Sequence, residues 1–166
     1  MYTIQDLLQD YNFYNVISIN VKLQINAPQE TVWGIISTID NDQKYWSRIK
    51  SIRNISKNQN HTTRELTTIN GSKCFQKITL FHREGIHIRW TRGPMVGIKD
   101  IMLTGIGNKT FLNVEINYKL SGVVRIVPKS VLEELQVEAE QALLGIKKEA
   151  ENRYLSYYGL ENYEVI

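Results

Sequence analysis

Hydrophobic and polar residues alternate in a short segment near the start of the chain and then change to helical spacing. Val21, Leu23 and Ile25 alternate with polar residues, which predicts a strand with one buried face. Pro28 suits the first turn of a helix, and the apolar residues that follow share one helical face: Val32, Trp33, Ile35, Ile36 and Ile39. Residues 40–42 interrupt that pattern and can cap a second turn, which carries Tyr45, Trp46 and Ile49. The segment 26–46 therefore predicts two short helices behind a strand.

The pattern from residue 52 to residue 120 predicts six more strands and no helix. Alternating segments are separated by turn signals at Asn70-Gly71, at 83–85, at 92–97 and at 107–109. No linker-like composition or internal repeat divides them, so we expect a meander within one domain.

One long helix is predicted to close the chain. Ser130 and Glu133 have the spacing of a capping box. A continuous apolar stripe follows, formed by Val131, Leu135, Ala139, Ala142, Leu143, Ile146 and Ala150. We expect this helix to run from about Ser130 to about Arg153, and a short helix or ordered arm to precede the first strand.

Composition narrows the function classes. The 166 residues carry a net charge of +3, with basic residues scattered rather than gathered in a patch, so we expect no nucleic-acid partner. The N-terminus lacks a signal-peptide pattern and no segment is apolar enough to span a membrane, which favours a cytoplasmic protein. A single cysteine, Cys74, excludes a disulfide framework, and three scattered histidines predict no metal site. We expect no cofactor.

The segment "INAPQETVWGIISTIDNDQKYW" resembles the start of the START and polyketide-cyclase superfamily, also called SRPBCC and shared with birch-pollen allergens. The matching positions are Ala27, Pro28, Glu30, Val32, Trp33 and Trp46. The resemblance implies a helix-grip fold of the α+β class, with a seven-stranded antiparallel sheet wrapped around the C-terminal helix and two short helices between strands 1 and 2. The domain would span 1–166, with a core at 17–152, an N-terminal arm at 1–16 and a C-terminal tail at 153–166.

Elementary packing agrees with that fold, because a sheet with one apolar face needs a cover and the long helix is the element long enough to supply it. The two short helices would plug one end of the curved sheet. Trp33 and Trp46 are accordingly predicted to be core residues rather than ligand contacts.

A curved sheet around a helix tends to leave a cavity, and hairpin registers indicate which residues face it. We expect His82 opposite Ile86, Gln76 opposite Glu65, and Leu103 opposite Val114. The predicted ligand-binding wall comprises Gln76, Ile78, Leu80, Ile88, Trp90, Met95, Ile101, Leu103, Val114, Ile116, Tyr118, Leu135, Ala139 and Leu143. The alternative is that these residues pack a closed core.

Few polar residues could carry chemistry in such a cavity. The weak catalytic candidates are Glu65, His82 and Tyr118, with no nucleophile–base pair among them. His82 adjoins a turn and could equally be solvated, and in another register Glu65 and Gln76 would face solvent. Cys74 is predicted to be a core residue. The loop "TRGPMVG" could be a gate at the cavity mouth, with Met95 as an adaptable contact, or an ordinary turn.

Three functions remain open. We expect binding or transport of a lipid-like or aromatic, polyketide-like small molecule. The alternatives are a cyclase or dehydratase acting in the same cavity, and a protein-interaction module. A homodimer could form through the tyrosine-rich termini, which hold Tyr2, Tyr11, Tyr14, Tyr154, Tyr157, Tyr158 and Tyr163.

Overall fold

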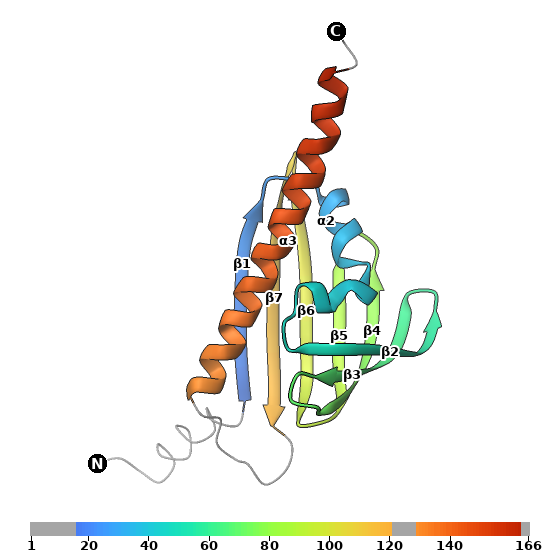
Figure 1. Cartoon of the computed structure of the whole chain (residues 1–166), viewed down its shortest axis with the longest axis vertical. Coiled ribbons are helices and arrows are strands. Elements are labelled where there is room, and N and C mark those ends of the chain that lie inside the picture. Colours follow the sequence, from blue (N-terminus) through green and yellow to red (C-terminus); the bar gives the residue numbers. More distant parts are fainter. Residues whose placement is uncertain (1–15, 121–128, 164–166) are drawn as a thin grey trace, which may run out of the picture.

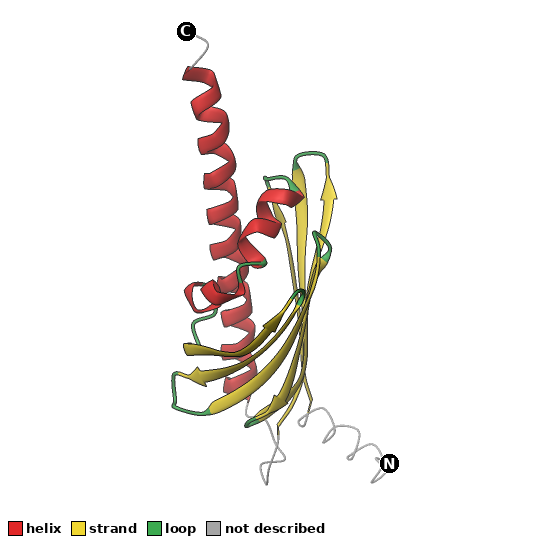
Figure 2. Cartoon of the chain, turned by 90° about the vertical axis from the view of Figure 1, so that its right-hand side faces the viewer, coloured by secondary structure: helices red, strands yellow, loops and turns green. Residues whose placement is uncertain are grey.

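Seven strands pair in one antiparallel sheet, and the helical segments of the described residues lie on one face of it (Figures 1 and 2). The computed structural model describes residues 16–120 and 129–163. The elements are β1 (Val16–Ile25), α2 (Gln29–Ile36), the 3-10 helix η1 (Ile39–Lys44), β2 (Ile49–Asn58), β3 (His61–Thr68), β4 (Lys73–Phe81), β5 (Gly85–Arg92), β6 (Met95–Ile106), β7 (Lys109–Leu120) and α3 (Lys129–Tyr163). The predicted N-terminal arm lies outside the described residues.

The strand order is β1-β7-β6-β5-β4-β3-β2, so the strands form a meander except that the first strand pairs with the last. Val21 of β1 lies opposite Val114 of β7, which places two inward apolar side chains side by side. This topology confirms the predicted seven-stranded antiparallel sheet.

The sheet curves around the helices, with α3 along its concave side (Figure 2). α2 packs against α3 and also contacts β6 and β7. Trp33 of α2 and Trp46 beyond η1 are both buried, at 8% and 4% exposure. The short helices therefore fill the space between sheet and α3, and both tryptophans are buried in the core.

α3 is longer than the sequence predicted, because residues 154–163 continue the helix instead of forming a tail. Its last turns project beyond the end of the sheet (Figure 1), and Leu155 and Tyr157 are exposed there. The apolar stripe reaches Tyr154, which is partly buried against the core, and ion pairs one helical turn apart add support to a helix. Lys147 with Glu151 and Arg153 with Glu149 form such pairs at 2.6 and 2.9 Å.

Two predicted hairpin registers are wrong by two residues. Ile86 pairs with Leu80 rather than His82, and Val114 pairs with Ile101 rather than Leu103. In the first hairpin the loop lies one residue earlier than expected, with Arg83 at φ 66°. Gly85 belongs to β5, where an added Cβ would lie 2.3 Å from the Ile101 carbonyl oxygen. A two-residue shift keeps every side chain on its face, so the predicted inward face survives.

The β3–β4 register is wrong by one residue, which does change faces. Gln76 lies opposite Arg64, and Glu65 lies opposite Phe75. The loop is longer than the expected two-residue turn because the Asn70 side-chain oxygen accepts hydrogen bonds from Thr68 and from the Ser72 N–H. Glu65 consequently faces away from the interior, whereas Gln76 faces inward.

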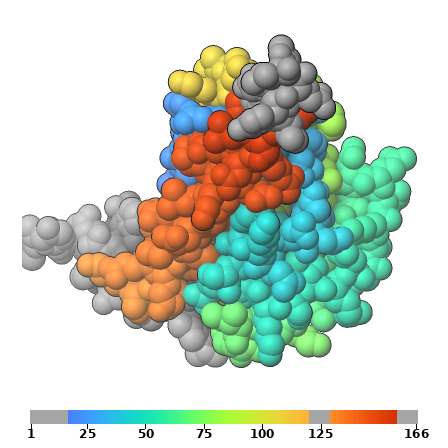
Figure 3. Space-filling model, turned by 45° about the horizontal axis from the view of Figure 1, so that its top comes forward, coloured from blue at the N-terminus to red at the C-terminus, as the bar shows by residue number. Residues whose placement is uncertain are grey.

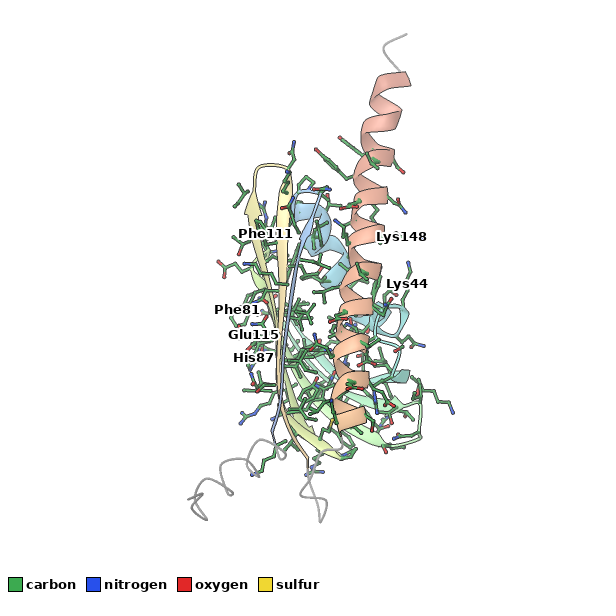
Figure 4. The ribbon with its side chains drawn as sticks, turned by 90° about the vertical axis from the view of Figure 1, so that its left-hand side faces the viewer. Lys44, Phe81, His87, Phe111, Glu115 and Lys148 are labelled. Carbon is green, nitrogen blue, oxygen red and sulfur yellow. The ribbon has the colours of Figure 1, made fainter. Side chains whose placement is uncertain are left out.

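The outer face of the sheet is more polar than the inner one. Phe81, His87 and Glu115 lie on the side turned away from α3 (Figure 4), and His87 Nδ1 is 2.6 Å from Asp100 Oδ1 there. No described helix combines the length and the apolar character that crossing a membrane requires.

Candidate functional site

Most of the predicted wall residues lie in the interior between the sheet and α3. Twelve are buried: Gln76, Ile78, Ile88, Trp90, Ile101, Leu103, Val114, Ile116, Tyr118, Leu135, Ala139 and Leu143. Leu80 and Met95 are half-buried. Five of the fourteen line a small cavity of about 40 Å³, namely Trp90, Met95, Ile116, Tyr118 and Leu135. That any of them contacts a ligand stays a prediction.

The same cavity has a polar side that the sequence did not predict. Trp46, Arg48, Ile49, Thr68, Lys99 and Glu138 complete its lining. They come from β2, β3, β6, α3 and the segment between η1 and β2. An apolar enclosure with a few convergent polar groups is the usual composition of a small-molecule site.

Lys99 is the most unusual group in this lining, because its side chain is buried at 4% exposure. Its Nζ lies 3.4 Å from the ring centroid of Trp46, an arrangement that stabilises the ammonium through the ring's quadrupole. Burial lowers the pKa of Lys99 to about 8, against the opposing charges of Asp42 and Glu138. Arg64 lowers that pKa further.

Arg64 forms a buried polar cluster beside the cavity. The guanidinium donates to Gln76 Oε1 at 2.9 Å, to the Ile39 carbonyl at 2.8 Å and to Asp42 Oδ2 at 2.5 Å. Burial raises the pKa of Asp42, and the Arg64 charge opposes that shift. Gln76 therefore accepts a hydrogen bond from Arg64 rather than pairing with Glu65 as the predicted register implied. The cluster connects η1 to β3 and β4.

Trp90 on β5 and Tyr118 on β7 form the aromatic part of the cavity wall. Their rings meet edge to face, with centroids 5.3 Å apart. Burial raises the pKa of the Tyr118 hydroxyl far above its ordinary value, so this group is a neutral O–H at physiological pH. The Trp90 N–H offsets a small part of that shift, but it is buried without a hydrogen bond of normal geometry.

Glu138 closes the cavity on the helix side. Its Oε2 accepts hydrogen bonds from the Arg48 backbone N–H at 2.7 Å and from the Ser47 hydroxyl at 3.4 Å. Beyond these contacts lies an outer groove of about 520 Å³, lined by Ser47, Arg48, Ile69, Ser130, Glu133, Glu134, Val137, Glu138 and Gln141. Figure 3 shows the N-terminal turns of α3 (orange) beside the segment around η1 (turquoise). Arg48 and Glu138 border both spaces, so they stand between the cavity and solvent.

Two of the three weak catalytic candidates lie away from the cavity. Glu65 forms ion pairs with Arg53 and Lys73 on the outer face. Its pKa is lowered, mainly by the hydrogen bond from Arg53. His82 is exposed in the β4–β5 loop, with its ring 5.8 Å from that of Trp33. Tyr118 alone of the three lines the cavity. Cys74 is a buried core residue, and burial raises its pKa.

Only Gly93 and Pro94 of the "TRGPMVG" segment lie between β5 and β6, and its other residues belong to these strands. Gly97 is a paired residue of β6, and an added Cβ would lie 2.1 Å from the Asn117 carbonyl oxygen. The close approach of the two backbones explains the glycine at position 97. Met95 of the same segment lines the cavity.

Sequence reasoning missed Lys99, Arg64, Asp42 and Glu138. Strand alternation could have found Lys99, because Ile101 and Leu103 were predicted to face inward and Lys99 shares their parity. Arg64 became visible only with the correct β3–β4 register. Glu138 is on the helix face of Leu135 but one turn further along, where a charged residue is ordinarily assigned to solvent.

No protein-family model and no curated protein matches the chain in sequence. Solved structures resemble it in fold. The Zhui aromatase/cyclase from Streptomyces sp. R1128 is 13% identical with a TM-score of 0.68, over 83% of this chain and 95% of that one. A START superfamily protein from Mycobacterium smegmatis is 14% identical with a TM-score of 0.59, over 84% and 98%. Ara h 8.0201 is 15% identical with a TM-score of 0.61, over 85% and 99%. The chain therefore shares the helix-grip fold of these structures, an antiparallel sheet curved around a long C-terminal helix.

Proposed function

We propose that this protein binds a hydrophobic small molecule between the sheet and α3. The observation that carries the proposal is the cavity between Trp90, Ile116 and Leu135, enclosed by apolar side chains and fitted with a small set of buried polar groups. The fold supports it, since structures with this fold include an aromatase/cyclase and a START superfamily protein. The lipid-like or aromatic nature of the ligand and a cytoplasmic location are parts of this proposal.

The size of the site bears on how a ligand would enter. A cavity of about 40 Å³ has room for little more than water, whereas small-molecule pockets usually measure about 300–1,000 Å³. The outer groove of about 520 Å³ supplies that volume, and it meets the cavity at Arg48 and Glu138. We expect the ligand to part the Glu138 contacts with Ser47 and Arg48 and to occupy the groove and the cavity together.

Binding of an uncharged, polarity-sensitive dye such as Nile red tests the proposal. We expect saturable binding to the folded protein and displacement by long-chain alcohols or polycyclic aromatics. Leu135→Ala enlarges the cavity and should raise dye affinity, whereas Ile116→Phe fills it and should lower affinity. Leu144→Ala is the matched control, because Leu144 lies on the same helix with 49% exposure and does not line the cavity. Equal affinities in all variants, or no saturable binding, would refute the proposal.

Catalysis in the same cavity is the second candidate, because Lys99, Tyr118 and Glu138 place an amine, a hydroxyl and a carboxylate around one space. Turnover of a cyclisable poly-β-ketone substrate, lost in Tyr118→Phe or Glu138→Gln with the fold intact, would establish it. Retention of full turnover in both variants would exclude these residues as the catalytic groups.

A further inference from the structure

Lys99 is a buried cation with no counter-ion at ion-pair distance among the described residues. It makes no ion pair or hydrogen bond with any residue in 16–120 or 129–163, and its contact there is with the face of Trp46. A buried charge is costly unless a partner and hydrogen bonds compensate it. The ammonium has three N–H donors, and an aromatic face satisfies them only weakly.

Two further donors line the same cavity. The N–H of Trp90 is buried without a hydrogen bond of normal geometry, and Trp90 is 7% exposed. The neutral hydroxyl of Tyr118 belongs to the same wall. Most buried polar groups in proteins have a well-formed hydrogen bond, so a buried N–H without one, in the same cavity as a buried ammonium, indicates room for an acceptor.

The nearby carboxylates already have other partners. Asp42 is held by Arg64, and Glu138 accepts from Arg48 and Ser47. Their charges act on Lys99 from η1 and α3, and the Arg64 charge opposes them from β3. The cavity therefore offers the donors of Lys99, Trp90 and Tyr118, whereas Asp42 Oδ2 and Glu138 Oε2 accept hydrogen bonds from other residues.

We propose that Lys99, with the N–H of Trp90 and the hydroxyl of Tyr118, binds the carboxylate of an apolar acid whose hydrocarbon part fills the remaining cavity and the outer groove. This inference rests on the proposed function and names the chemical class of its ligand. A carboxylate supplies both the negative charge and the several lone pairs that these donors require, and such charge-assisted hydrogen bonds are the strong ones.

Matched pairs of acid and alcohol test the inference by isothermal titration calorimetry. The probes are dodecanoate with dodecan-1-ol and 2-naphthoate with 2-naphthalenemethanol. We expect at least one acid to bind about tenfold or more tightly than its alcohol. Lys99→Met, which replaces the ammonium with an apolar side chain one atom shorter, should abolish that preference, so that each acid binds no more tightly than its matched alcohol. Lys77→Met is the control, because Lys77 is exposed on β4.

Proton uptake gives a second readout that a structural role would not produce. At pH 8 free Lys99 is about half protonated, and a bound carboxylate raises its pKa, so acid binding should take up as much as half a proton. Titrations in two buffers of different ionisation enthalpy measure this uptake. Asp42, Glu138, Arg64, Arg48 and Tyr118 also surround the site, and Lys99→Met separates their contribution from that of Lys99.

The outcomes distinguish this inference from the proposed function. If alcohols and Nile red bind but acids show no preference, or if Lys99→Met keeps the preference and the proton uptake, the carboxylate site is refuted and the hydrophobic site stands. If neither member of any pair binds and Nile red also fails, both proposals are refuted.

Discussion

Arg64 on β3 and Asp42 on η1 form a buried ion pair, with 2.5 Å between Nη2 and Oδ2. The Arg64 side chain is 1% exposed, so the charge of Asp42 is essential to it. Asp42→Ala leaves a buried arginine without its partner and should lower the free energy of unfolding by about 3–5 kcal/mol, measured by urea denaturation.

Asp40→Ala is the matched control for this prediction. Asp40 lies on the same 3-10 helix, but its ion pair with Lys57 is half exposed. Exposed pairs contribute about 1 kcal/mol or less, so this variant should be nearly as stable as the wild type. Equal losses in the two variants would contradict the role assigned to Arg64.

Trp33 should contribute strongly to stability because it is buried between α2 and the interior. Trp33→Ala should lower the free energy of unfolding by about 3–5 kcal/mol, as large aromatic deletions in cores do. His82→Ala removes the exposed ring that contacts Trp33 and should cost about 1 kcal/mol or less. A wild-type melting temperature for Trp33→Ala would show that the tryptophan is not part of the core.

Lys99 should make stability depend on pH in the alkaline range. Its pKa is about 8 in the folded protein and 10.5 when unperturbed, so between these values the unfolded chain binds more protons. The free energy of unfolding therefore rises as the pH increases from 8 to 10.5. Below pH 8 the full cost of burying the charged ammonium lowers it. Lys99→Met should raise the free energy of unfolding at pH 7 by about 3 kcal/mol.

The advantage of Lys99→Met should shrink towards pH 10.5, and urea denaturation of both proteins at pH 7 and pH 10 measures this change. Lys77→Met serves as the exposed control and should follow the wild type at both values. A constant difference between Lys99→Met and the wild type would mean that Lys99 has an ordinary pKa.

Two glycines should respond oppositely to alanine. Gly97 has φ 149°, and its new Cβ would lie 2.1 Å from the Asn117 carbonyl oxygen, so Gly97→Ala should disrupt β6–β7 pairing and lower the melting temperature. Gly34 lies in α2 with nothing within 4 Å of an added Cβ. Gly34→Ala should stabilise the protein by about 0.5–1 kcal/mol through helix propensity. A neutral Gly97→Ala would rule out the close approach of the two strands.

The sequence predicted the sheet and its cover because hydrophobic periodicity and turn residues act locally. The inward face of β4–β7 was correct even where the register was not, since a two-residue shift preserves side-chain direction. The polar side of the cavity was missed because it depends on a one-residue detail at Asn70 and on a charged residue, Lys99, in an inward position. Such positions oppose the general burial preference, and only tertiary partners such as Trp46 make them tolerable.

The pairing of β1 with β7 sets the order in which the chain can complete its fold. The Ser18 hydroxyl donates to the Asn117 side chain 99 residues later in the sequence. On the ribosome the first strand must therefore wait, with its edge unpaired, until nearly all of the sheet has been synthesised. Contacts of this sequence separation slow folding, because the intervening chain loses its entropy before the pairing is gained. The exposed polar positions of β1, which include the charged Lys22, give a nascent chain some protection against edge-to-edge association during that interval.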